Sequence, residues 1–371
     1  MQEKPFFRLA YLIGSTGWGG LEMNQIHNAE WMRLRGHTVL ILCVKNSPAS
    51  VYLAKKNIPH LLIQKHRNHF DLWRAFCLWR LLKKEGIQHL MIRSVFDMSI
   101  AASVCFFSGK KIKAHYFMEM QLSSNKKQWF RTLRYRYFSS WNCPLTYMKQ
   151  QVEQHTLMPH ERIFLIPSAV NDAFYDRLNQ DELRKELGLP KKQLLIGLFG
   201  RIDRKKNQLI ALKALSKMNE PNLTLLIIGQ ETPDDPQEYL AELHAFIKRQ
   251  QLESIVKFTG HVEEVSAYIH AVDACLITSS NESVGMVTLE ALAAGKIVIG
   301  TNSGGTKELL GNGAGYLFDP NDSNQLASIL TELKTVSNKT LEMHISNMGK
   351  NRIEKVCEQV ENLLLLSSRI A

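Results

Sequence analysis

The stretch ACLITSSNESVGMVTLEALAAGKIVIG, residues 274–300, indicates the fold class of this chain. It begins with the apolar run Ala274–Ile277 and ends with a second one, Ile297–Gly300, and such runs are typical of strands covered on both faces. Between them lie a polar loop and a helical pattern that Gly285 introduces. A strand, a helix and a second strand in this order predict a βαβ unit, which belongs to a parallel sheet.

The same alternation recurs along the chain. In the first half, a glycine-rich turn and a helix separate two apolar runs, and Gly36 stands where a C-terminal helix glycine belongs. Two successive series, each with its own glycine loop, predict an α/β protein with two doubly wound domains. The expected strands are 7–13, 37–43, 193–199, 223–228, 256–259, 274–277 and 297–300, and the expected helices include 21–35, 208–218 and about 341–371.

The domain boundary is expected near Pro167. A chain of 371 residues is about right for two domains, and an irregular segment around Pro167 separates the two series. The predicted N-terminal domain covers residues 1–167 and the predicted C-terminal domain residues 168–349, with a last helix at about 350–371.

Composition argues against several classes of protein. The six cysteines lie far apart without a CxxC pair, which predicts buried reduced thiols and neither a zinc site nor a disulfide framework. No apolar run reaches the roughly 18 residues that a spanning helix needs, so we expect no integral membrane protein. The start of the sequence, Met1–Lys4, lacks the basic region of a signal peptide, which favours a cytoplasmic protein.

Positive charge is concentrated in the first half of the chain. Residues 1–167 hold 24 Lys and Arg against 9 Asp and Glu, a balance of +15, whereas residues 168–371 have a balance of −4. This asymmetry predicts that the first half faces an anionic partner, for which nucleic acid and an acidic membrane surface are the two candidates.

Two glutamates flank the helix start at Gly285. Glu282 precedes the helix and Glu290 lies within it. Free N–H groups at a helix N-terminus bind phosphate, and carboxylates hydrogen-bond the vicinal hydroxyls of ribose or a hexose. The alternative is that both glutamates are solvated surface charges.

A second candidate site is the loop after the strand at 193–199. Gly200 and Arg201 end that strand and Lys206 follows five residues later, so two cations could clamp a diphosphate and stabilise it as a leaving group. The alternative is a basic surface loop, because Arg204 and Lys205 are also present.

The glycine-rich turn of the first half, Gly17–Gly20, is followed by Glu22. Glycines after a first strand let a ligand approach the backbone. The spacing is not a clean GxGxxG, and residues 41–44 contain no acidic residue for a nicotinamide nucleotide. No GxxxxGK[ST] occurs, which argues against a P-loop hydrolase.

Together these motifs resemble the retaining glycosyltransferases of family 4, which have the GT-B fold of two Rossmann-like domains facing a central cleft. The matches follow the family's order from residue 7 to about 320, with weaker support between 45 and 165. They are Gly19–Glu22 with Leu34–Val39, then Gly200–Arg201 with Lys206, and Glu282–Gly300 continued by Gly304–Glu308.

The resemblance implies a role for each matched residue. The N-terminal domain takes the acceptor, the C-terminal domain binds the nucleotide-sugar in the cleft, and the last helix packs back on the N-terminal domain. Gly19 and Gly20 approach the reacting centre. On the donor side, Arg201 and Lys206 bind the diphosphate, beside Gly200. The segment Gly260, His261 and Val262 lies near the base, and Glu290 binds the ribose. Glu282 contacts the sugar, and Gly285, Met286 and Val287 hold phosphate or sugar groups.

The resemblance also implies chemistry without a bound metal or cofactor. The nucleotide-sugar, UDP- or GDP-linked, is a substrate, and the sequence contains no Asp-x-Asp that would hold a divalent ion against a diphosphate. Catalysis would then depend on positioning and leaving-group stabilisation, with Arg201, Lys206 and Glu282 as the catalytic candidates.

Three positions depart from the family pattern. Asn207 follows Lys206 where the family usually has glycine, and Ala169–Asn171 replaces Gly-Val-Asp. A family histidine is expected near residue 115, so His115 is a catalytic candidate, although the family position falls closer to Met118. If Met118 is that position, acceptor chemistry would depend on Glu119 or the substrate phosphate, and His115 would be an ordinary strand residue.

Two segments of the first half, 65–84 and 126–138, mix aromatic residues with Lys and Arg. This mixture suits a membrane headgroup interface. The alternatives are amphipathic core helices or a stacking surface for nucleic acid, and the resemblance argues against nucleic acid. We therefore expect a peripheral protein on the cytoplasmic face of a membrane.

The resemblance implies a retaining, metal-independent, hexosyltransferase-type enzyme with a saccharide or lipid-linked saccharide acceptor, working in polysaccharide, lipopolysaccharide or glycolipid assembly. Three alternatives stay open. They are a sugar-nucleotide epimerase or phosphorylase of the same fold, a non-catalytic scaffold that binds nucleotide and membrane, and a nucleic-acid binder that uses the basic half.

Overall fold

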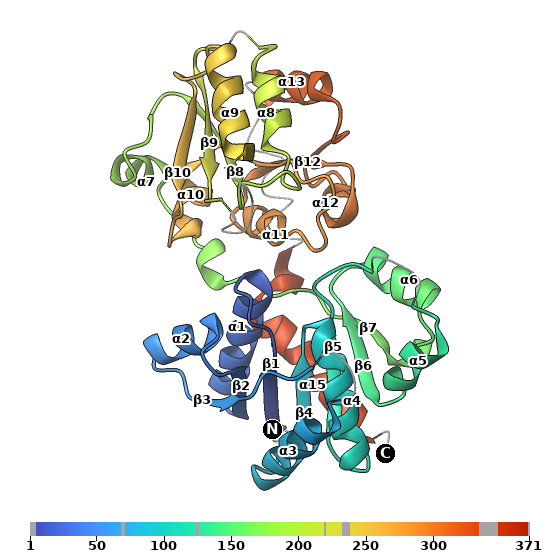
Figure 1. Cartoon of the computed structure of the whole chain (residues 1–371). Helices are drawn as coiled ribbons and strands as arrows, with labels where there is room; N and C mark the ends of the chain where they lie inside the picture. The colour runs from blue at the N-terminus through green and yellow to red at the C-terminus, as the bar shows by residue number, and fades with distance from the viewer. Residues whose placement is uncertain are drawn as a thin grey trace. The chain divides into compact units, whose positions relative to one another are not determined.

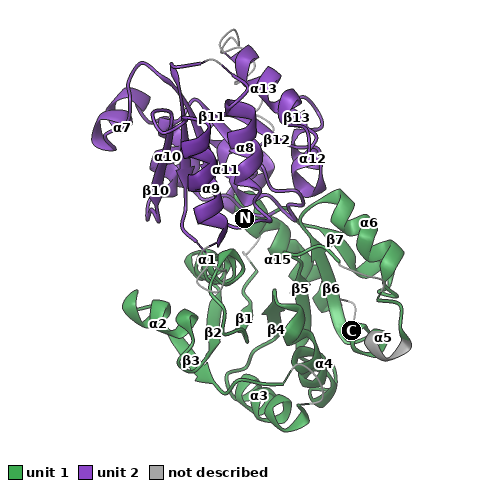
Figure 2. Cartoon of the chain, turned by 45° about the horizontal axis from the view of Figure 1, so that its top comes forward, with its two compact units in different colours: residues 1–167, 354–371 green, residues 168–353 purple. Residues whose placement is uncertain are grey.

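The computed structural model describes residues 5–67, 71–122, 126–218, 220–231, 238–333 and 348–369. By its internal contacts the chain divides into two compact units, shown in Figure 2. Unit 1 comprises Met1–Pro167 and Glu354–Ala371, and unit 2 comprises Ser168–Ile353. Each unit contains one sheet with helices around it (Figure 1).

Unit 1 is built on a seven-stranded parallel sheet with the strand order β3-β2-β1-β4-β5-β6-β7. Its strands are β1 (Arg8–Ile13), β2 (Thr38–Val44), β3 (His60–Ile63), β4 (His89–Ile92), β5 (Lys113–Phe117), β6 (Phe138–Cys143) and β7 (Ile163–Leu165). Its helices are α1 (Gly20–Leu34), α2 (Pro48–Lys55), α3 (Leu72–Lys84), α4 (Met98–Phe107), α5 (Trp129–Tyr135), α6 (Thr146–His155) and α15 (Ile353–Arg369), and η1 (Val95–Asp97) and η2 (His160–Arg162) are 3-10 turns.

Unit 2 is built on a six-stranded parallel sheet with the order β10-β9-β8-β11-β12-β13. Its strands are β8 (Leu194–Phe199), β9 (Leu223–Ile228), β10 (Val256–Gly260), β11 (Ala274–Ile277), β12 (Ile297–Thr301) and β13 (Tyr316–Phe318). Its helices are α7 (Gln180–Glu186), α8 (Gln208–Leu215), α9 (Glu238–Arg249), α10 (Val265–Ala271), α11 (Met286–Ala293), α12 (Gly304–Leu310) and α13 (Ser323–Glu332), with 3-10 turns η3 (Asp172–Phe174) and η5 (Met348–Asn351).

The apolar runs form the strands because helices cover both faces of each sheet. All six residues of β9 are buried, as are all four of β4 and β11. The predicted doubly wound α/β fold is confirmed, and each predicted strand lies within one residue of an observed one. The helix predicted to reach residue 218 ends at Leu215. Of the predicted final helix, residues 341–347 and 370–371 lie outside the described residues.

The last helix, α15, belongs to unit 1 from Glu354 onward (Figure 2). Arg35 donates from Nε and Nη2 to the two carboxylate oxygens of Glu361 at 2.7 and 2.8 Å, and His37 Nε2 lies 3.0 Å from Glu361 Oε1. Burial alone would raise the pKa of Glu361, but the hydrogen bonds from Arg35 and His37 outweigh it and lower that pKa. Lys113 Nζ also donates to the backbone oxygen of Ser367.

The basic segment 126–138 is only partly a surface. Tyr135 and Phe138 are buried in the core, with 1% exposure each, and Tyr135 packs edge-on against Trp141. The expectation that the aromatic residues of this segment form a headgroup interface is therefore wrong for these two. In segment 65–84, Phe70 lies outside the described residues.

Five of the six cysteines are buried and outside any disulfide, as predicted, whereas Cys77 is exposed on α3. Within the described residues, no helix combines the length and the apolar character that crossing a membrane would require.

We predict that Glu361→Ala lowers the free energy of unfolding by about 3 kcal/mol, because it leaves Arg35 and His37 without their carboxylate partner. Glu358→Ala is the matched control, since Glu358 is on the same helix and its ion pair among the described residues is with exposed Lys355. Chemical denaturation of both variants checks this, and equal losses would contradict a special role for the Glu361 contact.

Candidate functional site

The strand order of unit 2 reverses between β8 and β11. Because all strands are parallel, their carboxyl ends lie at one edge, and the loops after β8 and β11 lead away from each other. Open α/β sheets bind ligands in the crevice at such a reversal. Gly200, Arg201 and Lys206 follow β8, and Glu282 and Gly285 follow β11. The chain topology thus brings both predicted loops to one edge.

The loop after β8 is fixed to its surroundings by hydrogen bonds. Thr278 Oγ1, at the end of β11, donates to the backbone oxygen of Lys206 at 2.6 Å, and the Lys206 N–H donates to Asp203 Oδ1 at 3.0 Å. Gln208 Nε2 donates to the backbone oxygen of Arg201 at 2.8 Å. The backbone is held, whereas the Arg201 side chain is 66% exposed with its Nε 3.8 Å from Asp203. Arg201 is therefore open to an anionic ligand.

Lys206 and Glu282 meet directly, although 76 residues separate them. Lys206 Nζ donates to Glu282 Oε2 at 2.9 Å, and the two side chains are 26% and 22% exposed. The backbone oxygen of Glu282 accepts from the N–H of Gly305 at 2.7 Å, which fixes the loop to the start of α12. A phosphate arriving here would compete with Glu282 for the lysine.

The start of α11 presents backbone donors at this edge. Gly285 is the N-cap with φ +76° and ψ +55°, a left-handed conformation that glycine adopts without strain, and it has no side chain that could cap the helix. The first N–H groups of a helix have no intrahelical partner, so those of Met286 and Val287, both half-buried, remain available.

Glu290 lies in the second turn of α11 and is partly buried. Within the described part of the chain it has no ion pair or hydrogen bond of its side chain. Desolvation raises the pKa of Glu290 to about 7. A carboxyl kept in this environment without a partner is a candidate for binding hydroxyl groups.

Two further predictions concern neighbouring positions. Asn207 has φ +53° and ψ +44°, which lies in the left-handed region. Asparagine tolerates this region, so it can stand where glycine is usual in the family that the sequence resembles. Gly260 ends β10, and exposed His261 and half-buried Val262 follow it. They lie at the same edge, but β9 separates their strand from β8.

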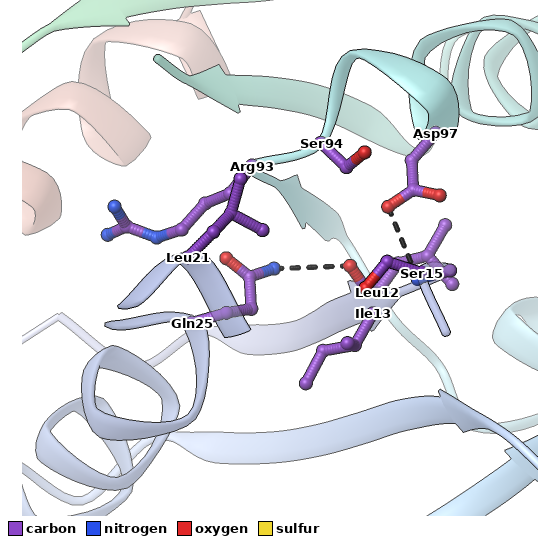
Figure 3. Close-up of a pocket in the computed structure, with 9 residues that line it drawn as sticks. Leu12, Ile13, Ser15, Leu21, Gln25, Arg93, Ser94 and Asp97 are labelled. Atoms are coloured by element: carbon purple, nitrogen blue, oxygen red, sulfur yellow. Dashed lines mark hydrogen bonds between the residues drawn. The ribbon is translucent and has the colours of Figure 1, made fainter. Parts of the chain in front are cut away.

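Unit 1 has the same kind of reversal, between β1 and β4. A small pocket lies at the carboxyl ends of these two strands (Figure 3). Figure 3 shows Gln25 and Asp97 on either side of the end of β1: Gln25 Nε2 donates to the backbone oxygens of Leu12 and Met91 at 3.3 and 3.0 Å, and the Gly14 N–H donates to Asp97 Oδ2 at 3.3 Å. The glycine-rich loop therefore starts from a fixed point.

A buried His66–Asp97 pair lies directly under that loop. His66 Nε2 is 2.8 Å from Asp97 Oδ1, and the side chains are 2% and 1% exposed. A Cβ atom at Gly14 would collide with both groups, so only glycine fits there. Burial alone would lower the pKa of His66, but the hydrogen bond to Asp97 outweighs it and raises that pKa.

Arg93, which follows β4, is the buried cation of this pocket. Its guanidinium lies 5.4 Å from the centre of the Phe117 ring and donates to the carboxylate of Glu119, which follows β5. Burial lowers the pKa of Arg93 to about 10. Glu119 thus neutralises the one arginine that lines the pocket.

Gly19 and Gly20 lie on unit 1 at the start of α1. Gly19 is the N-cap in an extended conformation, and a Cβ atom at Gly20 would meet no atom within 4 Å. Close by, Ser15 Oγ donates to the buried carboxylate of Glu22 at 2.5 Å. The two glycines therefore form an open stretch of backbone on a loop that is fixed at both ends.

The structure contradicts a catalytic role for His115. Its side chain is completely buried in β5, where Nε2 lies 3.1 Å from His89 Nδ1 and Nδ1 lies 2.9 Å from Ser140 Oγ. Desolvation lowers the pKa of His115 well below its ordinary value. A side chain inside the sheet cannot contact a substrate, so His115 is a structural histidine.

Three residues at the pocket of unit 1 were not predicted: His66, Arg93 and Asp97. Two of them could have been predicted from the local sequence. Arg93 and Asp97 follow the apolar run of β4, at the same end of the sheet as Gly14. Nothing in the sequence around His66 indicates its partner, which is 31 residues away.

We predict that Asp97→Asn destabilises unit 1 by about 2 kcal/mol at pH 6 and by less at pH 9. The raised pKa of His66 means that its contact with Asp97 stabilises the fold below the ordinary histidine pKa, and this contribution is lost as pH rises through the raised value. Thermal unfolding across this range checks it, with Asp172→Asn, an exposed aspartate of unit 2, as control. A loss that does not change with pH would contradict the ionic contact.

Comparison with known proteins gives a family match over most of unit 2. Residues 179–352 match the family described as "Glycosyl transferases group 1". The chain is 28% identical over 218 residues to N-acetyl-alpha-D-glucosaminyl L-malate synthase of Bacillus anthracis, covering 58% of this chain and 54% of that protein. It is 25% identical over 191 residues to lipopolysaccharide 1,2-N-acetylglucosaminetransferase of Salmonella typhimurium, covering 49% and 50%. The chain thus spans about half the length of these curated relatives.

Solved structures resemble the whole chain. Anabaena HepE in complex with UDP has a TM-score of 0.84 at 21% identity, over 98% of this chain and 100% of that one. A glycosyltransferase from Rickettsia africae has a TM-score of 0.85 at 18% identity, over 100% of both. These matches confirm the predicted pair of Rossmann-like domains. Residues 179–352 therefore match the family of glycosyl transferases group 1, and the chain has the GT-B fold.

Proposed function

We propose that this chain is a retaining glycosyltransferase of family 4. It moves a sugar from a nucleotide-sugar to a saccharide or lipid-linked saccharide. The observation that carries the proposal is the set of groups at the strand reversal of unit 2: exposed Arg201, the Lys206–Glu282 pair, and the unpaired, partly buried Glu290. The match of residues 179–352 to the glycosyl transferases group 1 supports it.

The donor site divides its work between cations and carboxylates. Arg201 and Lys206, beside Gly200, bind the diphosphate and stabilise the negative charge that grows on it as the sugar leaves. The N–H groups of Gly285–Val287 add donors on the other side of the reversal. This positive charge comes from the chain's own residues, so we propose a reaction that needs no metal ion.

The carboxylates recognise hydroxyl groups. Glu290, ionised on binding, accepts hydrogen bonds from the two ribose hydroxyls, while Gly260, His261 and Val262 lie toward the base. The diphosphate draws Lys206 away from Glu282, and Glu282 exchanges that contact for the sugar hydroxyls. Release of Glu282 thus couples binding of the diphosphate to recognition of the sugar.

Unit 1 supplies the acceptor side. Gly19 and Gly20 give an open backbone, and the loop that carries them is fixed by Asp97 and Glu22. With His115 buried, no imidazole of β5 serves the reaction, and the departing phosphate is the group that takes the acceptor proton. This step follows the expectation that acceptor chemistry depends on the substrate phosphate.

The names of relatives favour a UDP-linked donor and leave the acceptor open. The solved structure of HepE contains UDP, and the curated relatives are named for transfer to L-malate, to D-inositol 3-phosphate and in lipopolysaccharide. We propose polysaccharide, lipopolysaccharide or glycolipid assembly at the cytoplasmic face of a membrane as the setting.

We predict that UDP or GDP raises the melting temperature of the protein, and that EDTA does not change this shift. Arg201→Gln reduces the affinity for the nucleoside diphosphate by about tenfold, since it removes a forked phosphate contact. Lys205→Gln, an exposed cation of the same loop, is the matched control. Calorimetric titration measures both, and equal affinities in the two variants would contradict the phosphate assignment.

A second prediction uses Glu290→Gln, which should stabilise the protein and weaken nucleotide binding together. The folded-state pKa of about 7 lies above the unfolded one, so the wild type loses stability as pH rises from about 4.5 to 7, and the variant does not. The variant is then more stable by about 2 kcal/mol at pH 8 and equally stable at pH 4. Denaturation at both pH values, with nucleotide titration at pH 8, checks it. A variant that is destabilised at pH 8 would contradict this account.

Product analysis separates the remaining functions. A glycosyltransferase forms a new glycosidic bond only with an acceptor present, and nuclear magnetic resonance of the product shows whether the anomeric configuration of the donor is retained. Rearranged sugar-nucleotide without an acceptor would indicate an epimerase, and nucleotide binding without any turnover would indicate a scaffold.

A further inference from the structure

We propose that the outer face of α3 and the end of α4 dock onto an anionic lipid bilayer. We call this surface the aromatic face. It adds a location to the proposed function but does not depend on sugar transfer, because it lies on residues that the donor site does not use. Its apolar members are Leu72, Trp73, Phe76, Trp79, Phe106 and Phe107.

The aromatic face is a continuous row of rings that is open to solvent. Ring centres are 6.4 Å apart for Trp73 and Phe76 and 5.3 Å apart for Phe76 and Trp79. Phe107 of α4 packs edge-on against Phe76, with ring centres 5.7 Å apart. The ring centre of Phe107 also lies 5.7 Å from that of Phe106. Trp73 is 75% exposed and Phe106 60% exposed. A contiguous apolar patch of this kind marks an interaction surface.

Packing of α3 explains why these rings cannot turn inward. Ala75, Leu78 and Leu82 form the buried stripe of the helix and fill its contact with the core. The opposite side carries aromatic residues in the first turns and cations in the last ones. Rings beside cations on one helix surface suit the boundary between acyl chains and headgroups, where the rings insert and the cations stay at the phosphates.

The charge of the aromatic face favours an anionic partner. Arg80, Lys83 and Lys84 end α3, and Lys110 and Lys111 follow α4. Among the described residues none of these five has an ion pair, and Lys83 Nζ lies 5.4 Å from the centre of the Trp79 ring. A second copy of the same face would bring like charges together, whereas anionic lipid would neutralise them. Asp71 and Glu85 cap the two ends of α3, and Asp71 is paired with Arg74, so the cations beside the rings outnumber the acids and favour an anionic lipid surface.

The pocket of unit 1 does not explain the net positive charge of residues 1–167. Arg93 is neutralised there by Glu119, and Asp97 and Glu22 are acidic. The excess of Lys and Arg therefore lies outside this pocket. On the aromatic face, unpaired cations lie beside exposed rings.

Vesicle sedimentation of the full chain tests the proposal, using phosphatidylcholine vesicles with and without about one-third phosphatidylglycerol. The wild type should bind only the anionic vesicles, less tightly at high salt. Trp73→Ser with Phe106→Ser, and separately Arg80→Gln with Lys84→Gln, should each weaken binding by about tenfold or more. The matched controls are Leu178→Ser, an exposed leucine of unit 2, and Lys55→Gln with Lys56→Gln on α2.

The readouts distinguish the failure of this proposal from failure of the proposed function. The nucleotide-induced melting shift should be the same in all these variants, which also shows that they fold. Absence of vesicle binding, equal binding to neutral vesicles, or binding that the aromatic variant retains would overturn the proposal. Concentration-dependent dimers lost in the aromatic variant would indicate a second copy as the occupant, and oligonucleotide binding without vesicle binding would indicate nucleic acid.

Discussion

In each unit all strands are parallel and the strand order reverses once, and this constraint positions the loops of the candidate site. Parallel strands put all their carboxyl ends at one edge, and a reversal makes two neighbouring loops diverge there. In unit 2 the reversal lies between β8 and β11, in unit 1 between β1 and β4. Lys206 and Glu282 meet for this reason, and Gly14, Arg93 and Asp97 line one pocket for the same reason.

The two edges differ in how their charged side chains are paired. In unit 1 the buried charges are matched: His66 faces Asp97, and Arg93 faces Glu119. In unit 2 Lys206 faces Glu282, whereas Arg201 is exposed and Glu290 has a pKa raised by burial. A matched pair fixes a loop, while an unmatched group costs stability until a ligand supplies its partner. We propose that exposed Arg201 and partly buried Glu290 mark a ligand site in unit 2, whereas the His66–Asp97 and Arg93–Glu119 pairs fix the loops of unit 1.

Sequence reasoning was most successful where local patterns decide structure. The seven predicted strands lie within one residue of observed ones because their apolar runs are largely buried, whereas β3 to β7 and β13 were not predicted. Arg201, Lys206, Glu282 and Glu290 could be proposed as site residues because a strand, a loop and a helix start are all local features, and Lys206 and Glu282 do meet. The prediction was wrong for His115 and for Tyr135 with Phe138, because alternation and composition do not show which side of a sheet a covering helix occupies.

The sequence alone determined two βα series, their glycine loops and the charge asymmetry, since each depends on residues close together in the chain. Only the tertiary structure decided that Glu361 meets Arg35 across 326 residues, that His66 meets Asp97, and that the rings of α3 continue into Phe106 and Phe107. These contacts depend on strand order and helix packing. Strand order follows from the burial of the whole chain at once, which no local window of sequence contains.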